Sequence, residues 1–240
     1  MVETGLSQAT MHRVADDKLV SLVVHELRTP VAVMRAYAQL LEAHLGERAG
    51  PAATAHEIAG HILEQADLMA GWVDAMLEVR RLQLRELPLE RSPVDLVRLA
   101  WTVADELQQT TRDHRIRVVV SRHVPPPVLG DRARLRQVLS NLLENALRYT
   151  TGGVIQVRLG IQKGSCKAFI AVHDQGSGLN HRQLRTIFAP YKQAQSQSSG
   201  LGLGLYLSRH IARLHGGDLW AESRGHMNGS TFVLALPVEP

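Results

Sequence analysis

The chain has 240 residues, of which 45% are hydrophobic and 21% charged, with a formal net charge of +4. This composition is typical of a globular protein and excludes a fibrous or disordered chain. The arginines are spread along the chain, so we expect a solvated surface and no nucleic-acid partner. A single cysteine, Cys166, excludes an internal disulfide and a cysteine-only metal site. Its place in an expected strand predicts a buried, inert thiol.

The N-terminal residues lack a charged segment followed by an apolar one, so no signal peptide is predicted. The apolar runs fall short of the about 20 residues that a membrane-spanning helix needs. We therefore expect a cytoplasmic location and no membrane segment. The first predicted helix begins near residue 19, which leaves too few residues before it for another folded domain.

Residues 19–86 have the rhythm of two amphipathic helices, interrupted at Gly46–Pro51. A helical hairpin alone buries little apolar surface, so we expect two copies to pair as a four-helix bundle, which makes the protein a homodimer. The alternative is that the hairpin packs against the second half of its own chain. Apolar steps of three and four residues define the two stripes: Val20, Val23, Leu27, Pro30, Met34, Tyr37 and Leu41, then Ile58, Ile62, Gln65, Met69, Trp72, Met76 and Val79.

Two prolines within 87–93 predict a linker, which separates an N-terminal arm (1–18) and the hairpin (19–86) from a second domain (94–240). Strands and helices in this domain are segregated, which predicts an α+β fold: a mostly antiparallel sheet with helices on one face, as an α/β sandwich. Helices are predicted over 94–109, 132–149 and 203–217. Strands are predicted over 115–120, 152–161, 167–174 and 230–237, and a rigid turn over 124–131.

Three patterns in this domain have residue types that suit a nucleotide. Asn141, Asn145 and Arg148 share one helix face, and an amide oxygen suits Mg²⁺. Asp174 follows a strand and precedes two glycines, so its carboxylate can accept a hydrogen bond from an exocyclic amine. The glycines of "GLGLGL" lead into a helix whose N-terminus attracts phosphate. Each pattern alone also fits a polar helix face or an ordinary turn.

Taken in order, the patterns resemble the ATP-binding domain of sensor histidine kinases, which has the Bergerat fold. "NLLENALRYT" (141–150) is similar to the family's asparagine box, and "IFAPY" (187–191) to its phenylalanine box. "DQGSGL" (174–179) and "GLGLGL" (200–205) are similar to the two glycine boxes, although Leu201 stands where the family commonly has a small residue. The resemblance covers residues 93–240.

The resemblance implies that ATP and Mg²⁺ bind here, with Asn145 as the metal ligand and Asp174 reading the adenine amino group. It implies that a lid over the nucleotide spans residues 192–199. The other residues that it places around ATP are Asn141, Arg148, Tyr149, Gly176, Gly178, Lys192, Gly200, Gly202, Gly204 and Leu205.

The segment "HELRTP" in the first predicted helix places His25 two positions off the apolar stripe, where it should face solvent. This segment precedes a domain that resembles the Bergerat fold, and in that position it resembles the H-box of the histidine kinase dimerisation domain. This resemblance implies that His25 is the phosphoacceptor, Glu26 its general base and Thr29 a phosphatase residue. Pro30 has no N–H for the carbonyl of Glu26, which predicts a bend that either fits the bundle or takes part in signalling.

The predicted function is that of a histidine kinase, which autophosphorylates His25 from Mg-ATP and passes the phosphoryl group to the receiver domain of a response regulator. Phosphatase activity toward that regulator is expected as well. The alternative is a phosphatase-biased protein or a pseudokinase that acts as an ATP-gated interaction module. Because so few residues precede the first predicted helix, we expect either a missing sensor domain or a separate sensor protein.

Overall fold

The computed structural model describes residues 27–41, 52–84, 86–162, 164, 166–192 and 201–238. His25, Glu26, the predicted turn at 46–51 and Gly200 lie outside these residues. The chain divides into two compact units. The first comprises Met1–Leu77 with Ser199–Leu201, and the second comprises Glu78–Ser198 with Gly202–Pro240.

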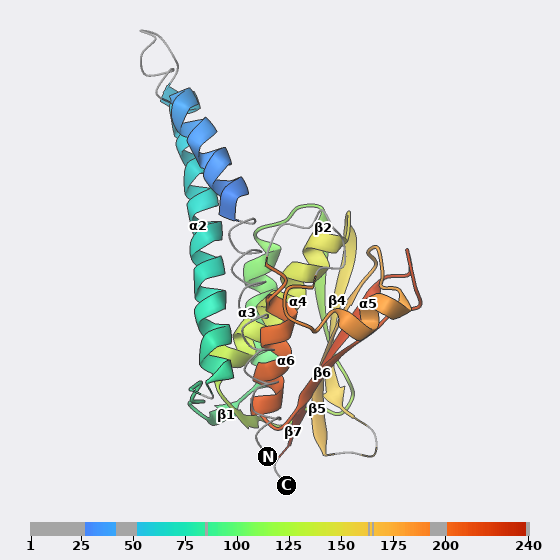
Figure 1. Cartoon of the computed structure of the whole chain (residues 1–240). Helices are drawn as coiled ribbons and strands as arrows, with labels where there is room; N and C mark the ends of the chain where they lie inside the picture. The colour runs from blue at the N-terminus through green and yellow to red at the C-terminus, as the bar shows by residue number, and fades with distance from the viewer. Residues whose placement is uncertain are drawn as a thin grey trace. The chain divides into compact units, whose positions relative to one another are not determined.

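The first unit contains a helix over 27–41 and most of helix α2 (Ala52–Gln83), which lie side by side (Figure 1). The rings of Tyr37 and His61 stack between the two helices, with their centroids 4.9 Å apart. Pro30 and Trp72 are buried, and every described residue of the two predicted apolar stripes is buried or half-buried. Two amphipathic helices are therefore confirmed, and their stripes account for the burial.

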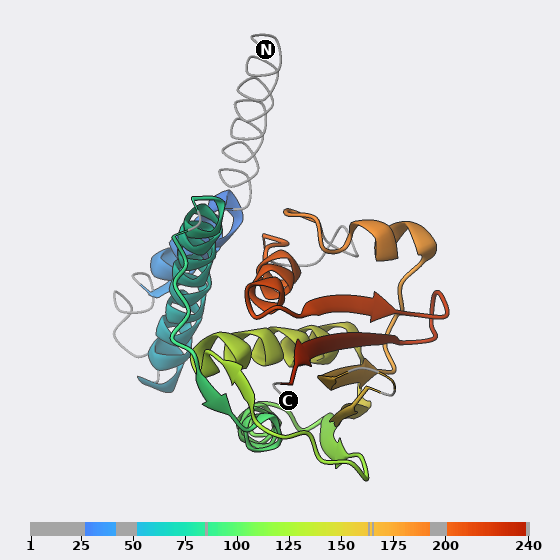
Figure 2. The ribbon, with the colours of Figure 1, turned by 90° about the horizontal axis from the view of Figure 1, so that it is seen from below.

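The second unit is built on a five-stranded sheet in the order β2-β4-β5-β7-β6. Strand β2 runs parallel to β4, and the other neighbours are antiparallel, so the predicted mostly antiparallel sheet is confirmed. Residues 223–229 connect β6 to β7, which are the two red arrows in Figure 2. The strands are β2 (His114–Val120), β4 (Gly153–Ile161), β5 (Lys167–Asp174), β6 (Asp218–Glu222) and β7 (Ser230–Pro237).

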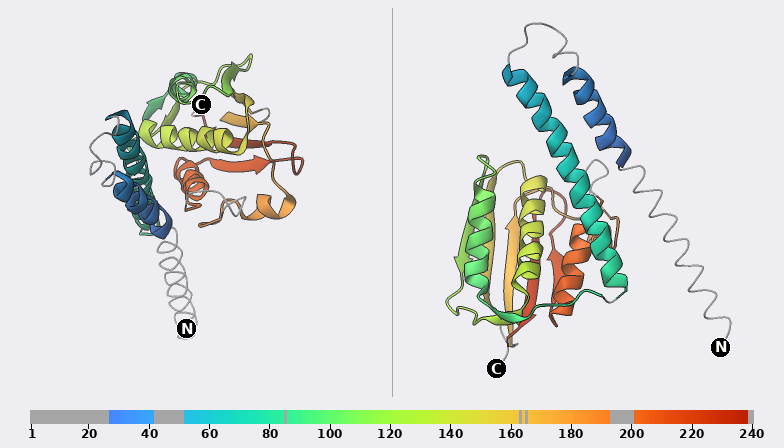
Figure 3. Two further views of the ribbon diagram at one scale, coloured as in Figure 1. Left: turned by 90° about the horizontal axis from the view of Figure 1, so that it is seen from above. Right: turned by 90° about the vertical axis from the view of Figure 1, so that its left-hand side faces the viewer.

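Helices α3 (Leu96–Gln108), α4 (Arg132–Tyr149) and α6 (Gly204–Leu214) cover one face of this sheet (Figure 3, right). Their apolar sides and the inward-facing residues of the strands form one continuous core. Asp95 caps α3 by accepting hydrogen bonds from two backbone amides, and Asp131 caps α4 by accepting one from Arg134. The predicted helix at 132–149 matches α4, because its repeating leucines and its aspartate cap are strong local signals.

Four short elements were not predicted. Strands β1 (Ser92–Val94) and β3 (Val128–Gly130) pair with each other. Strand β3 lies within the expected rigid turn, and β1 includes the last two residues of the expected linker. Strand β6 and helix α5 (His181–Thr186) are the other two. Elements of three to six residues are too short to show a periodicity in the sequence, and tertiary pairing decides them.

The expectation of a buried thiol is wrong, because Cys166 is exposed. It lies just before β5, in the connection from β4, where its carbonyl accepts a hydrogen bond from the backbone amide of Val238 at 2.9 Å. In the described part of the chain, no helix has the length and apolar character needed to cross a membrane.

Candidate nucleotide-binding site

Helix α4 contacts both glycine segments that the sequence singles out. Near its middle, Asn141 lies against Gly204, the first residue of α6. At its end, the carbonyl of Tyr149 accepts a hydrogen bond from the backbone amide of Ser177 at 3.2 Å. These two contacts are eight residues apart, or about 12 Å along a helix that rises about 1.5 Å per residue. The asparagine face of α4 therefore joins the two glycine segments in one site.

The two asparagines of α4 are connected to each other and to α6. Asn145 donates from its amide nitrogen to Oδ1 of Asn141 at 3.4 Å, and Asn141 donates to the hydroxyl of Ser208 at 2.9 Å. A Cβ on Gly204 would lie 2.2 Å from Oδ1 of Asn141, so no larger residue fits there without displacing that side chain. These hydrogen bonds orient both amides and leave the carbonyl oxygen of Asn145 as the one available to a ligand.

Asp174 ends strand β5 and is 4% exposed. Its Oδ1 accepts hydrogen bonds from the backbone amides of Gly176 at 2.8 Å and Ser230 at 3.2 Å. Burial raises the pKa of this carboxyl group, while the two hydrogen bonds and the nearby His173 act in the opposite direction. Both amides converge on one oxygen, so the other oxygen remains to accept a hydrogen bond from a ligand.

The first glycine turn is held by close backbone contacts. A Cβ on Gly176 would lie 2.2 Å from the carbonyl oxygen of Tyr149. Gly178 has a φ of +68°, and a Cβ there would lie 2.2 Å from the carbonyl oxygen of Gly225. The backbone amide of Met227 donates to the carbonyl of Ser177 at 2.7 Å. The turn is thus clamped between the end of α4 and the loop 223–229, and it has no room for side chains at its glycines.

The second glycine segment leads into α6 without a side-chain cap. Leu203 precedes the helix and makes no side-chain hydrogen bond to its first amides, so these amides can bind an anion. Gly202 has a φ of +65°, and a Cβ there would lie 2.8 Å from the carbonyl oxygen of Lys192. Lys192 is the first residue of the predicted lid and Gly202 lies shortly after it, whereas residues 193–199 lie outside the described residues.

The phenylalanine box packs next to α6. The Arg209 guanidinium lies 4.9 Å from the centre of the Phe188 ring, a cation–π contact. Arg209 also donates two hydrogen bonds to the carboxylate of Asp218, and these lower the pKa of Asp218. The Phe188 ring meets Phe232 of β7 edge to face, with centroids 6.4 Å apart. These contacts connect the segment before the lid to α6 and to the last strand.

The structure therefore brings most of the predicted nucleotide residues together around α4, β5 and α6. Arg148 is exposed on the last turn of α4, and Leu205 is half-buried on the first turn of α6. In the first unit, Thr29 is exposed, whereas His25 and Glu26 lie outside the described residues, as does Gly200.

Two serines of the candidate site were not predicted from the sequence. Ser208 is 2% exposed and orients Asn141, and Ser230 is 6% exposed and donates its amide to Asp174. Ser208 had a local signal, because it lies among the buried apolar residues of α6. A polar residue in such a position needs a partner. Ser230 acts through its backbone, and no residue type signals that.

Two family models match the chain. Residues 15–85 match the His Kinase A (phospho-acceptor) domain. Residues 130–240 match the histidine kinase-, DNA gyrase B- and HSP90-like ATPase. The second match contains both glycine segments and helices α4 and α6.

The chain is similar to curated proteins and solved structures along most of its length. It is 27% identical over 232 residues to the sensor histidine kinase WalK of Bacillus subtilis, covering 92% of this chain and 36% of WalK. The structure of full-length ShkA in complex with AMPPNP is 26% identical, with a TM-score of 0.67, and covers 92% of this chain and 45% of that one. The structure of the histidine kinase ThkA in complex with the response regulator protein TrrA is 22% identical, with a TM-score of 0.70, and covers 99% of this chain and 66% of that one.

The curated relatives are longer than this chain, which spans between 23% and 59% of their length. The two family models nevertheless follow each other in the order in which the structure places a helical unit and an ATP-binding unit. The described contacts bring the asparagine and glycine segments together as one site. On these grounds, the chain contains a histidine kinase core, which consists of a His Kinase A phospho-acceptor region and a histidine kinase-type ATPase region.

Proposed function

We propose that this protein is an ATP-dependent histidine kinase that autophosphorylates His25 and passes the phosphoryl group to an aspartate of a response regulator. The observation that carries the proposal is the convergence of Asn141, Asp174 and Gly204 on one site, in a chain that also matches the phospho-acceptor family. An ATP-binding site alone would fit many ATPases, whereas the two parts together fit transfer to a histidine.

The shape of the site suits ATP. Gly176 and Gly204 provide close approaches that a Cβ would fill, and the uncapped start of α6 offers amides to phosphate. The free oxygen of Asp174 accepts from the adenine amino group. Arg148, Gly202 and Leu205 are proposed to border the nucleotide, with Lys192 and the lid.

The residues present also fit Mg²⁺. This ion prefers oxygen ligands and in kinases takes one or two from the protein and the rest from phosphates and water. The carbonyl oxygen of Asn145 is such a ligand, since its amide nitrogen is occupied by Asn141. Bound there, Mg²⁺ would neutralise charge on the phosphates during transfer. No group of three acidic, histidine or cysteine residues that could hold a metal alone occurs among the described residues.

The phosphoacceptor role proposed for His25 uses the chemistry of imidazole. In its neutral form, the ring has a lone pair on one nitrogen for attack on the γ-phosphorus. Glu26 is proposed to accept the proton from the other ring nitrogen. The phosphoryl group moves from the β–γ bridging oxygen of ATP to the imidazole nitrogen, and ADP leaves.

The exposed hydroxyl of Thr29, four residues after His25, supports a second activity at the same place. We propose that it orients water for hydrolysis of the phosphorylated regulator. The rate at which the regulator loses its phosphoryl group should fall in Thr29→Ala and be kept in Thr29→Ser, which retains the hydroxyl. Equal rates in wild type and Thr29→Ala would refute this role.

Incubation with γ-labelled ATP and Mg²⁺ tests the main proposal. We expect label that is stable in base, labile in acid, and absent from His25→Gln, and we expect the label to pass to a receiver domain. His56→Gln is the matched control, because His56 is an exposed histidine elsewhere in the helical unit. An unlabelled wild type, in a preparation that binds AMPPNP, would favour an ATP-gated interaction module instead.

A further inference from the structure

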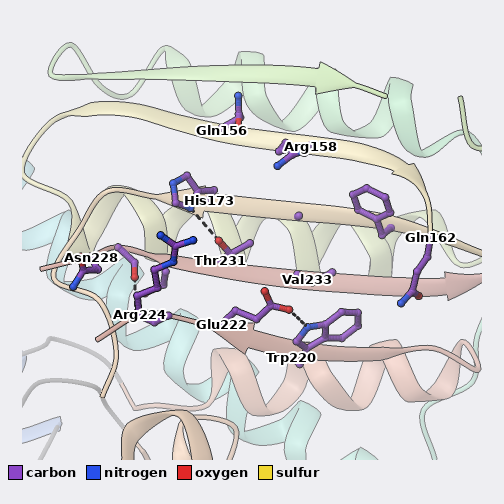
Figure 4. A pocket seen from close by; sticks show the side chains of 15 residues that line it. Gln156, Arg158, Gln162, His173, Trp220, Glu222, Arg224, Asn228, Thr231 and Val233 are labelled. Atoms are coloured by element: carbon purple, nitrogen blue, oxygen red, sulfur yellow. Dashed lines mark hydrogen bonds between the residues drawn. The ribbon is translucent and has the colours of Figure 1, made fainter. Parts of the chain in front are cut away.

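The sheet face that the helices leave uncovered carries an open groove of about 820 Å³ (Figure 4). Its floor is formed by the outward side chains of β4, β5 and β7, which alternate with the buried core residues of the same strands. Phe169 and Trp220 contribute aromatic surface, and Val233 lies between them on the floor. The groove lies wholly within the second unit, on the side of the sheet opposite α3, α4 and α6.

The groove and its border are basic. Arg158 of β4 and Arg224 of the β6–β7 loop line it and are exposed, and no ion pair involves either of them in the described part of the chain. On the neighbouring strand β2, Arg117 pairs in register with Gln156, so its exposed side chain lies on the same face. The acidic side chain in the lining of the groove is Glu222, whose Oε1 accepts a hydrogen bond from the indole N–H of Trp220 at 2.8 Å. Unpaired arginines beside aromatic rings are the side chains that dominate binding energy in protein interfaces.

These features favour an extended, acidic polypeptide over other occupants. Small-molecule sites are enclosed and mostly apolar, whereas this groove is open and lined largely by polar side chains. A nucleic acid would bring its phosphates close to the carboxylate of Glu222. A polypeptide can instead place carboxylates at Arg158 and Arg224 and apolar side chains over Val233 and the two aromatic rings.

The groove lies back to back with the nucleotide site. His173 lines the groove, and its Nδ1 shares a hydrogen bond with the hydroxyl of Thr231 at 3.0 Å. The neighbouring residues of the same two strands, Asp174 and Ser230, are also paired, and the Ser230 amide donates to Asp174 at the nucleotide site. The loop 223–229 also serves both sites. Ser223 and Gly229 line the groove, and the Ser223 hydroxyl accepts from the backbone amide of Leu179, in the first glycine segment, at 3.0 Å.

We propose that this outer sheet groove docks an acidic segment of a partner protein, and that docking changes the affinity for ATP through the loop 223–229. The docking itself is independent of the kinase activity, and only its effect on ATP rests on the proposed nucleotide site. Because Arg224 and Ser223 are adjacent, a partner that holds Arg224 also restrains the loop that clamps the first glycine turn. Such a surface gives a partner control over the kinase without covering the nucleotide.

The test uses a fluorescein-labelled, glutamate-rich peptide with interspersed leucines, and measures anisotropy on the full chain without nucleotide. We expect saturable binding that weakens at least tenfold in the double variant Arg158→Glu with Arg224→Glu. The matched control is Arg98→Glu with Arg132→Glu, which reverses two exposed charges on α3 and α4. Saturating peptide should also shift the dissociation constant of AMPPNP at least about fivefold, a typical size for coupled sites.

Equal binding by wild type and the groove variant would overturn the proposal, as would the absence of binding to wild type. A single-stranded oligonucleotide that binds in the groove more tightly than the peptide would overturn it in favour of a nucleic acid. A change of sedimentation coefficient in the groove variant would overturn it in favour of a second copy of this chain. Peptide binding in a protein that fails to bind AMPPNP would support the docking site and refute the nucleotide site instead.

Discussion

The backbone amide of Ser230 donates a hydrogen bond to Oδ1 of Asp174 at 3.2 Å, although the two residues are 56 positions apart in the chain. The amide of Gly176 donates to the same oxygen at 2.8 Å. One carboxylate oxygen is therefore engaged by the protein and the other is left to the ligand. Strand β7 and the first glycine turn together orient the group that is proposed to recognise adenine.

Asp174→Asn is expected to lower ATP affinity by about 10- to 100-fold, because an amide N–H₂ would face the adenine amino group and leave a buried donor unsatisfied, at about 1–3 kcal/mol. The fold should persist, since the remaining amide oxygen still accepts from Gly176 and Ser230. Calorimetric titration with AMPPNP measures the effect. Asp105→Asn, an exposed site on α3, is the control, and equal affinities for all three proteins would contradict the role of Asp174.

Gly204→Ala is expected to lower both the melting temperature of the ATP-binding unit and its affinity for AMPPNP. The added Cβ would lie 2.2 Å from Oδ1 of Asn141, so Asn141 must move and lose its hydrogen bond to Ser208. Overpacking of this kind costs about 1–3 kcal/mol.

Gly60→Ala is the matched control for that substitution. Gly60 also lies in a helix, but nothing lies within 4 Å of a Cβ built there. The same change should therefore stabilise α2 by about 0.5–1 kcal/mol, the usual gain of alanine over glycine in a helix. Calorimetric melting of both variants gives the comparison, and destabilisation of equal size in the two would contradict the steric explanation.

His215 is expected to make stability pH-dependent. Its Nε2 accepts from the amide of Asp131 at 2.9 Å, so Nδ1 carries the proton and donates to the carbonyl of Ile211 at 2.8 Å. Burial lowers the pKa of this ring, and nearby Arg91 acts in the same direction, against Ile211 and Asp131. The folded state thus binds a proton less readily than the unfolded state. The neutral ring of His215 therefore contributes to the free energy of unfolding in full above pH about 6.5, and this contribution is lost as the pH falls below that value.

Urea unfolding between pH 5.5 and pH 7.5 measures this dependence. His215→Gln retains an acceptor for the amide of Asp131 but has no proton to bind, so its stability should fall less steeply toward low pH than that of wild type. His226→Gln, at an exposed loop position, should behave like wild type. Parallel curves for wild type and His215→Gln would show that this ring is not responsible.

A second apolar stripe on α2 is expected to mediate homodimerisation. Its residues are exposed and recur in steps of three and four. They lie on a different side of α2 from the stripe that faces residues 27–41. Val73→Glu, near its centre, should dissociate the dimer or weaken it at least tenfold in analytical ultracentrifugation. Glu57→Lys, on the opposite side of α2, should not, and an unchanged dimer in Val73→Glu would place the interface elsewhere. The stripe consists of Leu63, Ala66, Ala70, Val73 and Leu77.

Much of the fold could be predicted because its signals are local. The leucine repeat and the aspartate cap define α4 to the residue, and the alternating β-branched residues define β4, β5 and β7. The exposure of Cys166 and the short strands β1, β3 and β6 could not be predicted in the same way. Whether a few residues pair or stay exposed depends on which distant segment lies next to them.

For the candidate site, residue types and spacing by themselves determined which segments are predicted to form it: the two asparagines of α4, the carboxylate at the end of β5, and the glycines before α6. Only the tertiary structure decided how they act together. The contact of Gly204 with Asn141, the hydrogen bond from Ser208, and the amide of Ser230 at Asp174 all join residues far apart in the chain. A backbone amide is the same in every residue but proline, so its role as a donor becomes visible only when folding brings it to its acceptor.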